Sequence, residues 1–459
     1  MTKFAYFNDN IIFVLLILLP IAIISGPFFS DLIVVISSLL FIFNTIFKKK
    51  YKYYNNYFFL FFFTWFFIFL FSSLLSDNIL FSFSSSLFYF RFIIFALVFW
   101  YLVEEKKLFG KYFTVSLILT LSFVIFDGLL QYFYGSNIFG FKYEGYRLSG
   151  VFNDEKILGS FISRLIPILF GLVIMFFNSK KEVIIFSLIL LILSDILIFI
   201  AGERTAFFYL MLSTLIIIIL ISKWKLIRIL SISFSTLAII LIILTNPNVK
   251  DRMLDYTLYQ IHHGYDLKSF DFEKGLSKKN TSEKGDETNK SNIKKFNIFS
   301  IQHEVIYTTS FKIFLDNKFI GIGPKMFRLI CKKQKYKTFT DLDRSIDGCQ
   351  THPHNTYIQL LTETGIIGFV PIFFLFISLT YVFIRDFFSK VYRKKSILND
   401  QQVCFFAATY ITLWPFIPTG NFFNNWLSII YYLPIGFILY EIQHKIILFK
   451  KNVFQNNKI

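Results

Sequence analysis

The sequence predicts an all-α polytopic membrane protein. Of its 459 residues, 55% are hydrophobic and only 17% are charged, whereas soluble domains are usually about one-quarter charged. Long apolar runs recur along the chain, and each is long enough to cross a hydrocarbon core of about 30 Å as a helix. This composition excludes a disordered chain, a coiled coil and an ordinary cytosolic enzyme.

Apolar runs of about 17–25 residues predict about twelve transmembrane helices. The first run is interpreted as an anchor rather than a signal peptide, because it lacks a small-x-small cleavage site and another span follows at once. The expected spans are 10–29, 31–47, 57–75, 87–103, 112–130, 157–177, 183–201, 205–221, 229–245, 356–384, 402–418 and 427–441.

Basic residues predict how these spans are oriented. Lys and Arg gather at alternate connections, for example at 48–52, 106–111 and 385–395, whereas the connections 76–86 and 418–426 carry none. By the positive-inside rule, both termini are expected to be cytoplasmic. The net charge of +18 is therefore interpreted as partly topological, and not as a nucleic-acid footprint.

This orientation divides the chain into three parts. Residues 1–245 hold the first nine spans, 246–355 form a large outer loop before the tenth span, and 356–459 hold the last three spans and a cytoplasmic tail. Within the loop, the very polar stretch near 266–297 is expected to be a mobile insert without chemistry of its own.

The segment 349–369 carries the main candidates for chemistry. Asn355, Gln359 and Glu363 are four residues apart, so they share one helix face, with His354 beside them. Polar and ionisable groups at the membrane boundary usually face a partner or a wet cavity, and a neutral imidazole can take a proton from an alcohol. The alternative is that these residues only cap the helix and line an interface. The residues alone leave both interpretations open.

The same segment resembles the signature of the O-antigen ligase family. In that family, His-Asn, His-Ser or His-Gln is followed after nine residues by Gly-x-x-Gly. Here His354-Asn355 is followed, without a gap, by Gly365-x-x-Gly368. The two glycines are expected to allow close approach of another helix.

Two further fragments resemble elements of this family. Gly321-x-Gly323, with Phe327 four residues later, is similar to its upstream Gly-x-Gly-x-x-x-Phe element. The corner 202–206 is similar to its Ser-x-x-Arg-Thr corner, and the large outer loop before the tenth span matches its topology.

The resemblance implies a membrane glycosyltransferase of the GT-C-like class in the bacterial inner membrane, without a metal ion or other cofactor. Its members move a glycan from undecaprenyl diphosphate to a sugar hydroxyl of lipid A–core on the periplasmic side. The matching histidine, His354, is implied to be the general base, and arginines are implied to hold the diphosphate. A polymerase of the same superfamily is the nearest alternative. A transporter of the lipid-linked glycan is a further one, but it predicts inverted repeats that this sequence lacks.

Arginine suits a diphosphate because its planar fork matches phosphate oxygens and it stays charged. Arg204 is the first candidate, since it lies at a short outer corner beside Glu203; the alternative is that these two form a surface ion pair. The full set of candidates is Arg204, Arg147, Arg252, Arg91 and Arg164.

The sequence departs from the family upstream of the Gly-x-Gly element. The family usually has an arginine there, and this chain has His303. His303 can replace the arginine as a cation only if its pKa is raised; otherwise Lys312 or Arg328 is expected to supply the contact.

Cys331 and Cys349 bracket an outer segment of 17 residues just before the histidine motif. On the oxidising side of the membrane they are expected to form a disulfide that fixes the approach to His354, two free thiols being the alternative. His352 and His354 match no standard metal-binding spacing, and no phosphate-binding loop for a nucleotide is present.

Overall fold

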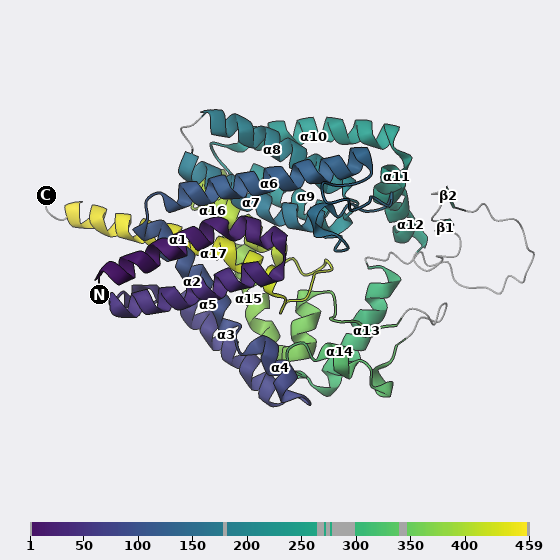
Figure 1. Cartoon of the computed structure of the whole chain (residues 1–459), viewed down its shortest axis with the longest axis horizontal. Helices are drawn as coiled ribbons and strands as arrows, with labels where there is room; N and C mark the ends of the chain where they lie inside the picture. The colour runs from purple at the N-terminus through teal and green to yellow at the C-terminus, as the bar shows by residue number, and fades with distance from the viewer. Residues whose placement is uncertain are drawn as a thin grey trace, which may run out of the picture.

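The computed structural model is built of helices, and a helix lies at each of the twelve positions expected to span the membrane (Figure 1). The fold class predicted from the sequence is therefore confirmed. The structure describes residues 2–177, 181–263, 270–271, 276–277, 299–338 and 347–456. Most of the polar insert near 266–297 lies outside the described residues.

The first half of the chain forms long helices joined by short connections, with 3₁₀ turns at η1 (Tyr51–Tyr53) and η2 (Gly150–Phe152). The helices are α1 (Thr2–Ser25), α2 (Pro27–Phe47), α3 (Tyr57–Leu74), α4 (Ile79–Ser86), α5 (Phe90–Glu105), α6 (Phe109–Tyr134), α7 (Leu158–Phe177), α8 (Lys181–Ile200), α9 (Arg204–Leu220) and α10 (Lys225–Thr245).

The second half begins with shorter elements and ends with three apolar helices. The strands β1 (Phe270–Asp271) and β2 (Leu276–Ser277) pair antiparallel. The other elements are α11 (Pro247–Lys250), the π-helical turn η3 (Asp251–Asp255), α12 (Tyr256–His263), α13 (Ile301–Asp316), α14 (Phe327–Ile330), the 3₁₀ turn η5 (Gln334–Tyr336), α15 (Thr356–Arg393), α16 (Asp400–Thr412) and α17 (Asn425–Asn456).

Ten helical segments in the described part of the chain are long and apolar enough to cross a membrane, with Ile79–Glu105, which contains α4 and α5, counted as one. The remaining two expected positions hold the shorter helices α9, of 17 residues, and α16, of 13 residues. The expected span 402–418 was too long, because helix α16 already ends at Thr412. Pro415 and Pro418 follow, and proline both lacks a backbone N–H and disfavours a helical residue before it.

Two other helix ends also differ from expectation. The first span was expected to reach residue 29, but α1 ends at Ser25, and Pro27 occupies the first turn of α2, where its missing N–H costs nothing. In α15 the backbone leaves the helical conformation at Gly365, whose φ is 64°. The tenth span therefore consists of a short outer helical piece, a break and a longer helix.

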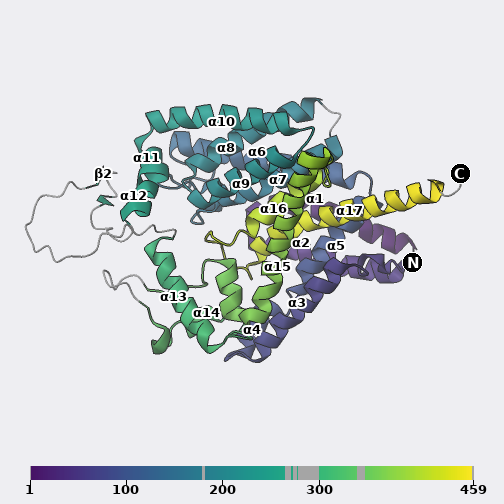
Figure 2. The ribbon, with the colours of Figure 1, turned by 180° about the vertical axis from the view of Figure 1, so that it is seen from behind.

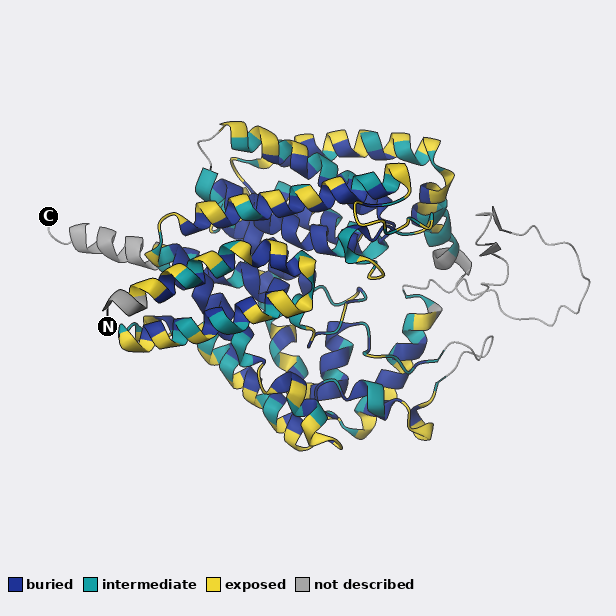
Figure 3. Cartoon of the chain, in the orientation of Figure 1, coloured by how far each residue is buried: buried dark blue, intermediate teal, exposed yellow. Residues whose placement is uncertain are grey.

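The helices surround a core centred on α5 and α7, which are buried along almost their whole length (Figure 3). Helix α17 packs against α5, and α16 packs against α7. Peripheral helices such as α10 instead expose large apolar side chains, among them Leu237 and Leu244. Exposed apolar surface of this extent is typical of a helix that faces lipid.

Both chain termini lie at one end of the helical bundle, and α11, α12 and α13 lie at the opposite end (Figure 1). Helix α13 packs against α15, which in turn packs against α3, and α14 lies near α4 in Figures 1 and 2. The segments that carry the candidate site residues therefore meet at the end of the bundle remote from the termini.

Candidate active site

The histidine motif is held at the start of α15. Asn355 is the N-cap residue, and its side chain accepts hydrogen bonds from the backbone N–H groups of Tyr357 (2.9 Å) and Ile358 (3.1 Å). His354 has a left-handed backbone with φ of 53°, and its carbonyl accepts a hydrogen bond of 2.8 Å from Thr419 N–H. The turn and this bond fix the backbone that carries the His354 imidazole.

Three imidazoles gather at this point. The ring of His354 lies 4.0 Å from that of His352 and 5.9 Å from that of His303, measured between centroids. His303 comes from α13, and its Nδ1 shares a hydrogen bond of 2.6 Å with the hydroxyl of Ser300. The structure therefore brings His303 next to His354.

Burial keeps these imidazoles neutral. It lowers the pKa of His354 below its usual 6.5. Burial, followed by the charges of His354 and Arg204, lowers the pKa of His303 to about 4. Burial and the proximity of His354 likewise lower the pKa of His352 to about 3. The raised pKa that His303 would need as a cationic phosphate ligand is therefore not found, whereas a neutral His354 can accept a proton.

The polar row of α15 (Asn355, Gln359 and Glu363) joins this helix to the connection between α16 and α17. Asn355 Nδ2 donates to the carbonyl of Pro415 at 2.7 Å. Gln359 Oε1 accepts from Phe422 N–H at 2.8 Å, and Gln359 Nε2 donates to Glu363 Oε2 at 2.9 Å. These buried side chains do share one face, as their spacing predicts, and that face positions a loop.

The two glycine motifs interlock at the break in α15. The backbone N–H groups of Ile322 and Gly323 donate to the carbonyls of Thr362 (3.2 Å) and Glu363 (2.8 Å). The Glu363 carboxylate also accepts from Phe327 N–H at 3.3 Å. The Gly-x-Gly segment thus satisfies backbone carbonyls that the interrupted helix leaves without intrahelical partners.

Glycine is required on both sides of this contact. A Cβ on Gly321 would lie 2.4 Å from the carbonyl carbon of Glu363, and one on Gly365 would lie 2.2 Å from the carbonyl oxygen of Phe319. Gly368 instead accepts a hydrogen bond of 2.8 Å on its carbonyl from the indole N–H of Trp65. The close helix approach expected at these glycines is therefore found at Gly368, where α3 packs, but Gly365 breaks the helix.

Two of the predicted phosphate-binding arginines form one group with two tyrosines. The guanidinium of Arg252 lies 4.4 Å from the ring centroid of Tyr146, and that of Arg204 lies 5.0 Å from the ring centroid of Tyr256. The charge of Arg204 contributes to the lowered pKa of His303, which places this Arg204–Arg252 group beside the imidazoles.

Glu203, the residue that would form a surface ion pair with Arg204 in the alternative interpretation, pairs with Arg147. Glu203 is buried, and its carboxylate forms an ion pair of 3.7 Å with Arg147. The same carboxylate accepts hydrogen bonds from Gly159 N–H (2.7 Å) and the Ser160 hydroxyl (2.6 Å) at the start of α7. The charge of Arg147 is thus largely compensated by Glu203.

The charge of Arg91, another predicted diphosphate ligand, is also compensated. Its guanidinium forms an ion pair of 2.8 Å with Asp31 and donates to the side chain of Asn425 at 3.0 Å. This pairing satisfies a charge inside a span, so Arg91 is the weakest of the predicted diphosphate ligands.

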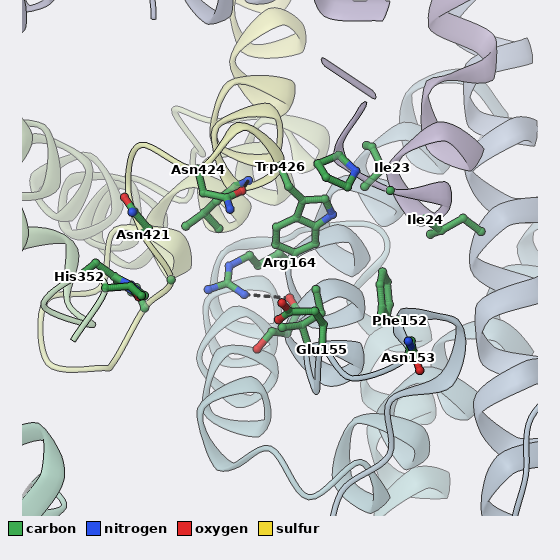
Figure 4. A pocket seen from close by; sticks show the side chains of 18 of the residues that line it. Ile23, Ile24, Phe152, Asn153, Glu155, Arg164, His352, Asn421, Asn424 and Trp426 are labelled. Carbon is green, nitrogen blue, oxygen red and sulfur yellow. Dashed lines mark hydrogen bonds between the residues drawn. The ribbon is translucent and has the colours of Figure 1, made fainter. Parts of the chain in front are cut away.

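A cavity of about 710 Å³ opens beside the histidine motif (Figure 4). It lies between the α1–α2 turn, the start of α7 and the connection between α16 and α17. Its polar lining includes Arg164, Arg328 and His352, together with the indole of Trp426. Arg164 points into the cavity in Figure 4 and donates to the carbonyl of Ser160 at 2.9 Å.

Residues 186–373 match the family model described as O-antigen ligase. This part of the chain belongs to the O-antigen ligase family. The matched region runs from α8 into α15 and contains the Arg204–Arg252 group, His303, both glycine motifs and His354. Members of the family are glycosyltransferase-like enzymes. No curated protein matches the chain.

The disulfide predicted for this O-antigen ligase domain is confirmed: Cys331 and Cys349 are bonded, with Cα atoms 5.1 Å apart. It ties the chain just after α14 to the segment that enters the histidine motif. Among the described residues, no group of three His, Cys, Asp or Glu side chains is arranged to hold a metal ion.

The structure brings together the histidine motif, the glycine motifs and the polar row, which the sequence singled out by motif and by spacing, but the sequence did not reveal the cavity. The sequence predicts Arg164 only as one of five candidate diphosphate ligands, and Arg328 only as an alternative to His303. The one available signal for Arg328 was its position directly after Phe327, the last residue of the Gly-x-Gly-x-x-x-Phe element.

Proposed function

We propose that the protein is an O-antigen ligase that moves a glycan from undecaprenyl diphosphate to a sugar hydroxyl of lipid A–core. The observation that carries this proposal is a buried, neutral His354 whose ring lies 5.9 Å from that of His303, the imidazole on which the charge of Arg204 acts, within the part of the chain that belongs to the family. The site would face the periplasm, since it lies at the end of the bundle opposite to both termini and the positive-inside rule predicts cytoplasmic termini (Figure 1).

In the proposed reaction, His354 takes the proton of the acceptor hydroxyl as its oxygen attacks the anomeric carbon of the donor. The bond between that carbon and the diphosphate oxygen breaks, and undecaprenyl diphosphate leaves with the electron pair. Arg204 and Arg252 stabilise the negative charge that develops on the leaving group. His303, being neutral, would orient a substrate or His354 by hydrogen bonding and would not supply charge.

The experiment that tests this function is His354→Ala in a bacterial strain that lacks its own copy, with surface polysaccharide examined by gel. Loss of polymer from lipid A–core, with long polymer accumulating on undecaprenyl diphosphate, is the expected result. His444→Ala is the matched control, because His444 lies on α17 near the chain terminus. It is expected to leave the pattern unchanged.

The same gel separates the two related activities. A polymerase would leave only single repeats on the carrier when His354 is lost, so this pattern would replace the ligase proposal with the polymerase alternative. An unchanged pattern would show that His354 is not the general base.

A further inference from the structure

The cavity beside His352 contains positive charge that the proposed donor site does not use. Arg164 is only 4% exposed, lines the cavity, and has a buried Nε atom without a hydrogen-bond partner. Arg328 lines the same cavity, and its Nε is also buried without a partner. Within the described part of the chain, neither arginine forms an ion pair with a carboxylate.

A buried guanidinium without an anion is costly, since a charge removed from water needs a partner of opposite sign. The cavity also contains Glu155, but that side chain is exposed and forms no ion pair with either arginine among the residues described. The charge of Arg328 also acts on the buried Glu363, but Glu363 does not line the cavity. The pair Arg164 and Arg328, which we call the cavity arginines, is therefore arranged for an anion that enters from outside.

The cavity arginines are distinct from the Arg204–Arg252 group. Arg204 and Arg252 stack on Tyr256 and Tyr146 and do not line the cavity. Each cationic group has a different imidazole beside it, since Arg328 lines the same cavity as His352, whereas the charge of Arg204 acts on His303. A single donor diphosphate needs only one of these groups.

The rest of the lining suits a sugar. Trp426 offers an aromatic ring and an indole N–H without a partner, and Asn421, Asn424 and Thr419 add amide and hydroxyl groups. A volume of about 710 Å³ lies within the range of roughly 300–1,000 Å³ typical of small-molecule sites. His352 lines the cavity only 4.0 Å from the ring of His354, so a sugar bound here would place a hydroxyl close to the proposed base.

We propose that this cavity binds the acceptor glycan, and that the acceptor carries a phosphate or carboxylate group which the cavity arginines recognise. This inference rests on the proposed function for its distinction between donor and acceptor. It adds that the acceptor is an anionic sugar and that Arg328 and Arg164 select it.

The test measures binding to the purified full-length protein in detergent, by isothermal titration with four probes. Glucose 6-phosphate and glucuronate represent an anionic acceptor, glucose is their neutral counterpart, and farnesyl diphosphate represents the donor. The protein is expected to bind the two anionic sugars at least tenfold more tightly than glucose. Arg328→Gln should remove this preference and leave farnesyl diphosphate binding within about twofold.

Three further variants make the result specific. Arg328→Lys keeps a positive charge and should retain part of the preference for anionic sugars. Lys332→Gln removes an exposed cation from the same segment and should change nothing. Arg252→Gln should weaken farnesyl diphosphate binding only. Because Arg328 forms no ion pair with any residue that the structure describes, Arg328→Gln should fold normally, which an unchanged melting temperature would verify.

The proposal is overturned if anionic sugars bind no better than glucose, or if Arg328→Gln leaves their preference intact. It is also overturned if Arg328→Gln abolishes binding of farnesyl diphosphate, since the cavity would then hold the donor. Farnesyl diphosphate binding that is as tight in Arg252→Gln as in the wild type would instead contradict the donor site of the proposed function.

Discussion

The backbone N–H of Gly323 donates a hydrogen bond of 2.8 Å to the carbonyl of Glu363. This contact joins the two glycine motifs of the O-antigen ligase domain, which lie about forty residues apart in the sequence. Glu363 ends the outer helical piece of α15 just before the break at Gly365, and that piece begins at the His354–Asn355 motif. The Gly-x-Gly segment therefore supports the helix that positions the proposed base.

Gly321→Ala should destabilise the protein far more than Gly145→Ala. The two glycines have similar left-handed φ values, 73° and 77°, so both alanines incur a strain of about 1–2 kcal/mol. Only at Gly321 would the new Cβ also meet backbone, 2.4 Å from Glu363, whereas nothing lies within 4 Å at Gly145. Thermal unfolding of the two variants in detergent measures the difference. Equal losses of stability in the two variants would show that the contact between Gly321 and the backbone of Glu363 can relax.

The rate of transfer should remain high as the pH falls below 6.5. The proposed base must be neutral, and burial lowers the pKa of His354, so its protonation and the fall in rate should be centred below that pH. His303 and His352, with pKa values of about 4 and 3, are also buried neutral. Their stabilising contribution is complete above pH 6.5 and is lost as pH falls, because the unfolded chain then binds more protons.

The measurement for this prediction is the pH dependence of kcat/KM, with a return to neutral pH to exclude irreversible unfolding. An acidic limb centred above pH 6.5 would contradict a buried neutral His354 as the base.

Replacing both Cys331 and Cys349 by serine should lower stability by about 3 kcal/mol, because the crosslink closes a loop with a sequence separation of 18 residues. Reductant should bring the wild-type unfolding midpoint close to that of the double variant and should not affect the variant itself. Cys404→Ala, which removes a buried free thiol, is the control and should remain sensitive to reductant. A wild-type midpoint that reductant does not change would count against the disulfide.

Asn355→Ala should reduce activity about tenfold or more, beyond its effect on stability. Loss of the N-cap alone costs about 1 kcal/mol, but Asn355 also holds the carbonyl of Pro415, so the loop beside His354 would be released. Asn56→Ala removes an equivalent cap from α3 and should affect stability alone. Comparing transfer rates of the two folded variants distinguishes positioning from capping; equal rates would exclude the positioning role.

The helical class and the polar row on α15 follow from the sequence because both depend on short-range spacing. Apolar runs set the spans, and residues four apart must share a helix face, so Asn355, Gln359 and Glu363 could be aligned without a structure. The break at Gly365 could not, because a glycine in an apolar helix is equally suited to close helix packing. Only the contact with Phe319 and the Gly-x-Gly segment distinguishes the two cases.

The arginines show a second limit of what the sequence alone can predict. Arg91 and Arg164 look alike in the sequence, since each lies in an apolar span near its outer end. Packing places Asp31 against Arg91 and the cavity against Arg164, and these neighbours come from distant parts of the chain. Similarly, the sequence could not show whether the pKa of His303 is raised or lowered, because the direction depends on how deeply the folded chain buries this side chain.

The central claim is that His354 is the general base, and the initial rate of glycan transfer by purified His354→Gln tests it most directly. The variant keeps a polar side chain but cannot accept a proton at neutral pH, and general-base catalysis typically contributes about 10²–10⁴-fold. The rate should therefore fall by at least 100-fold, with binding of farnesyl diphosphate and the melting temperature unchanged. A His354→Gln variant that transfers glycan at close to the wild-type rate would contradict the assignment.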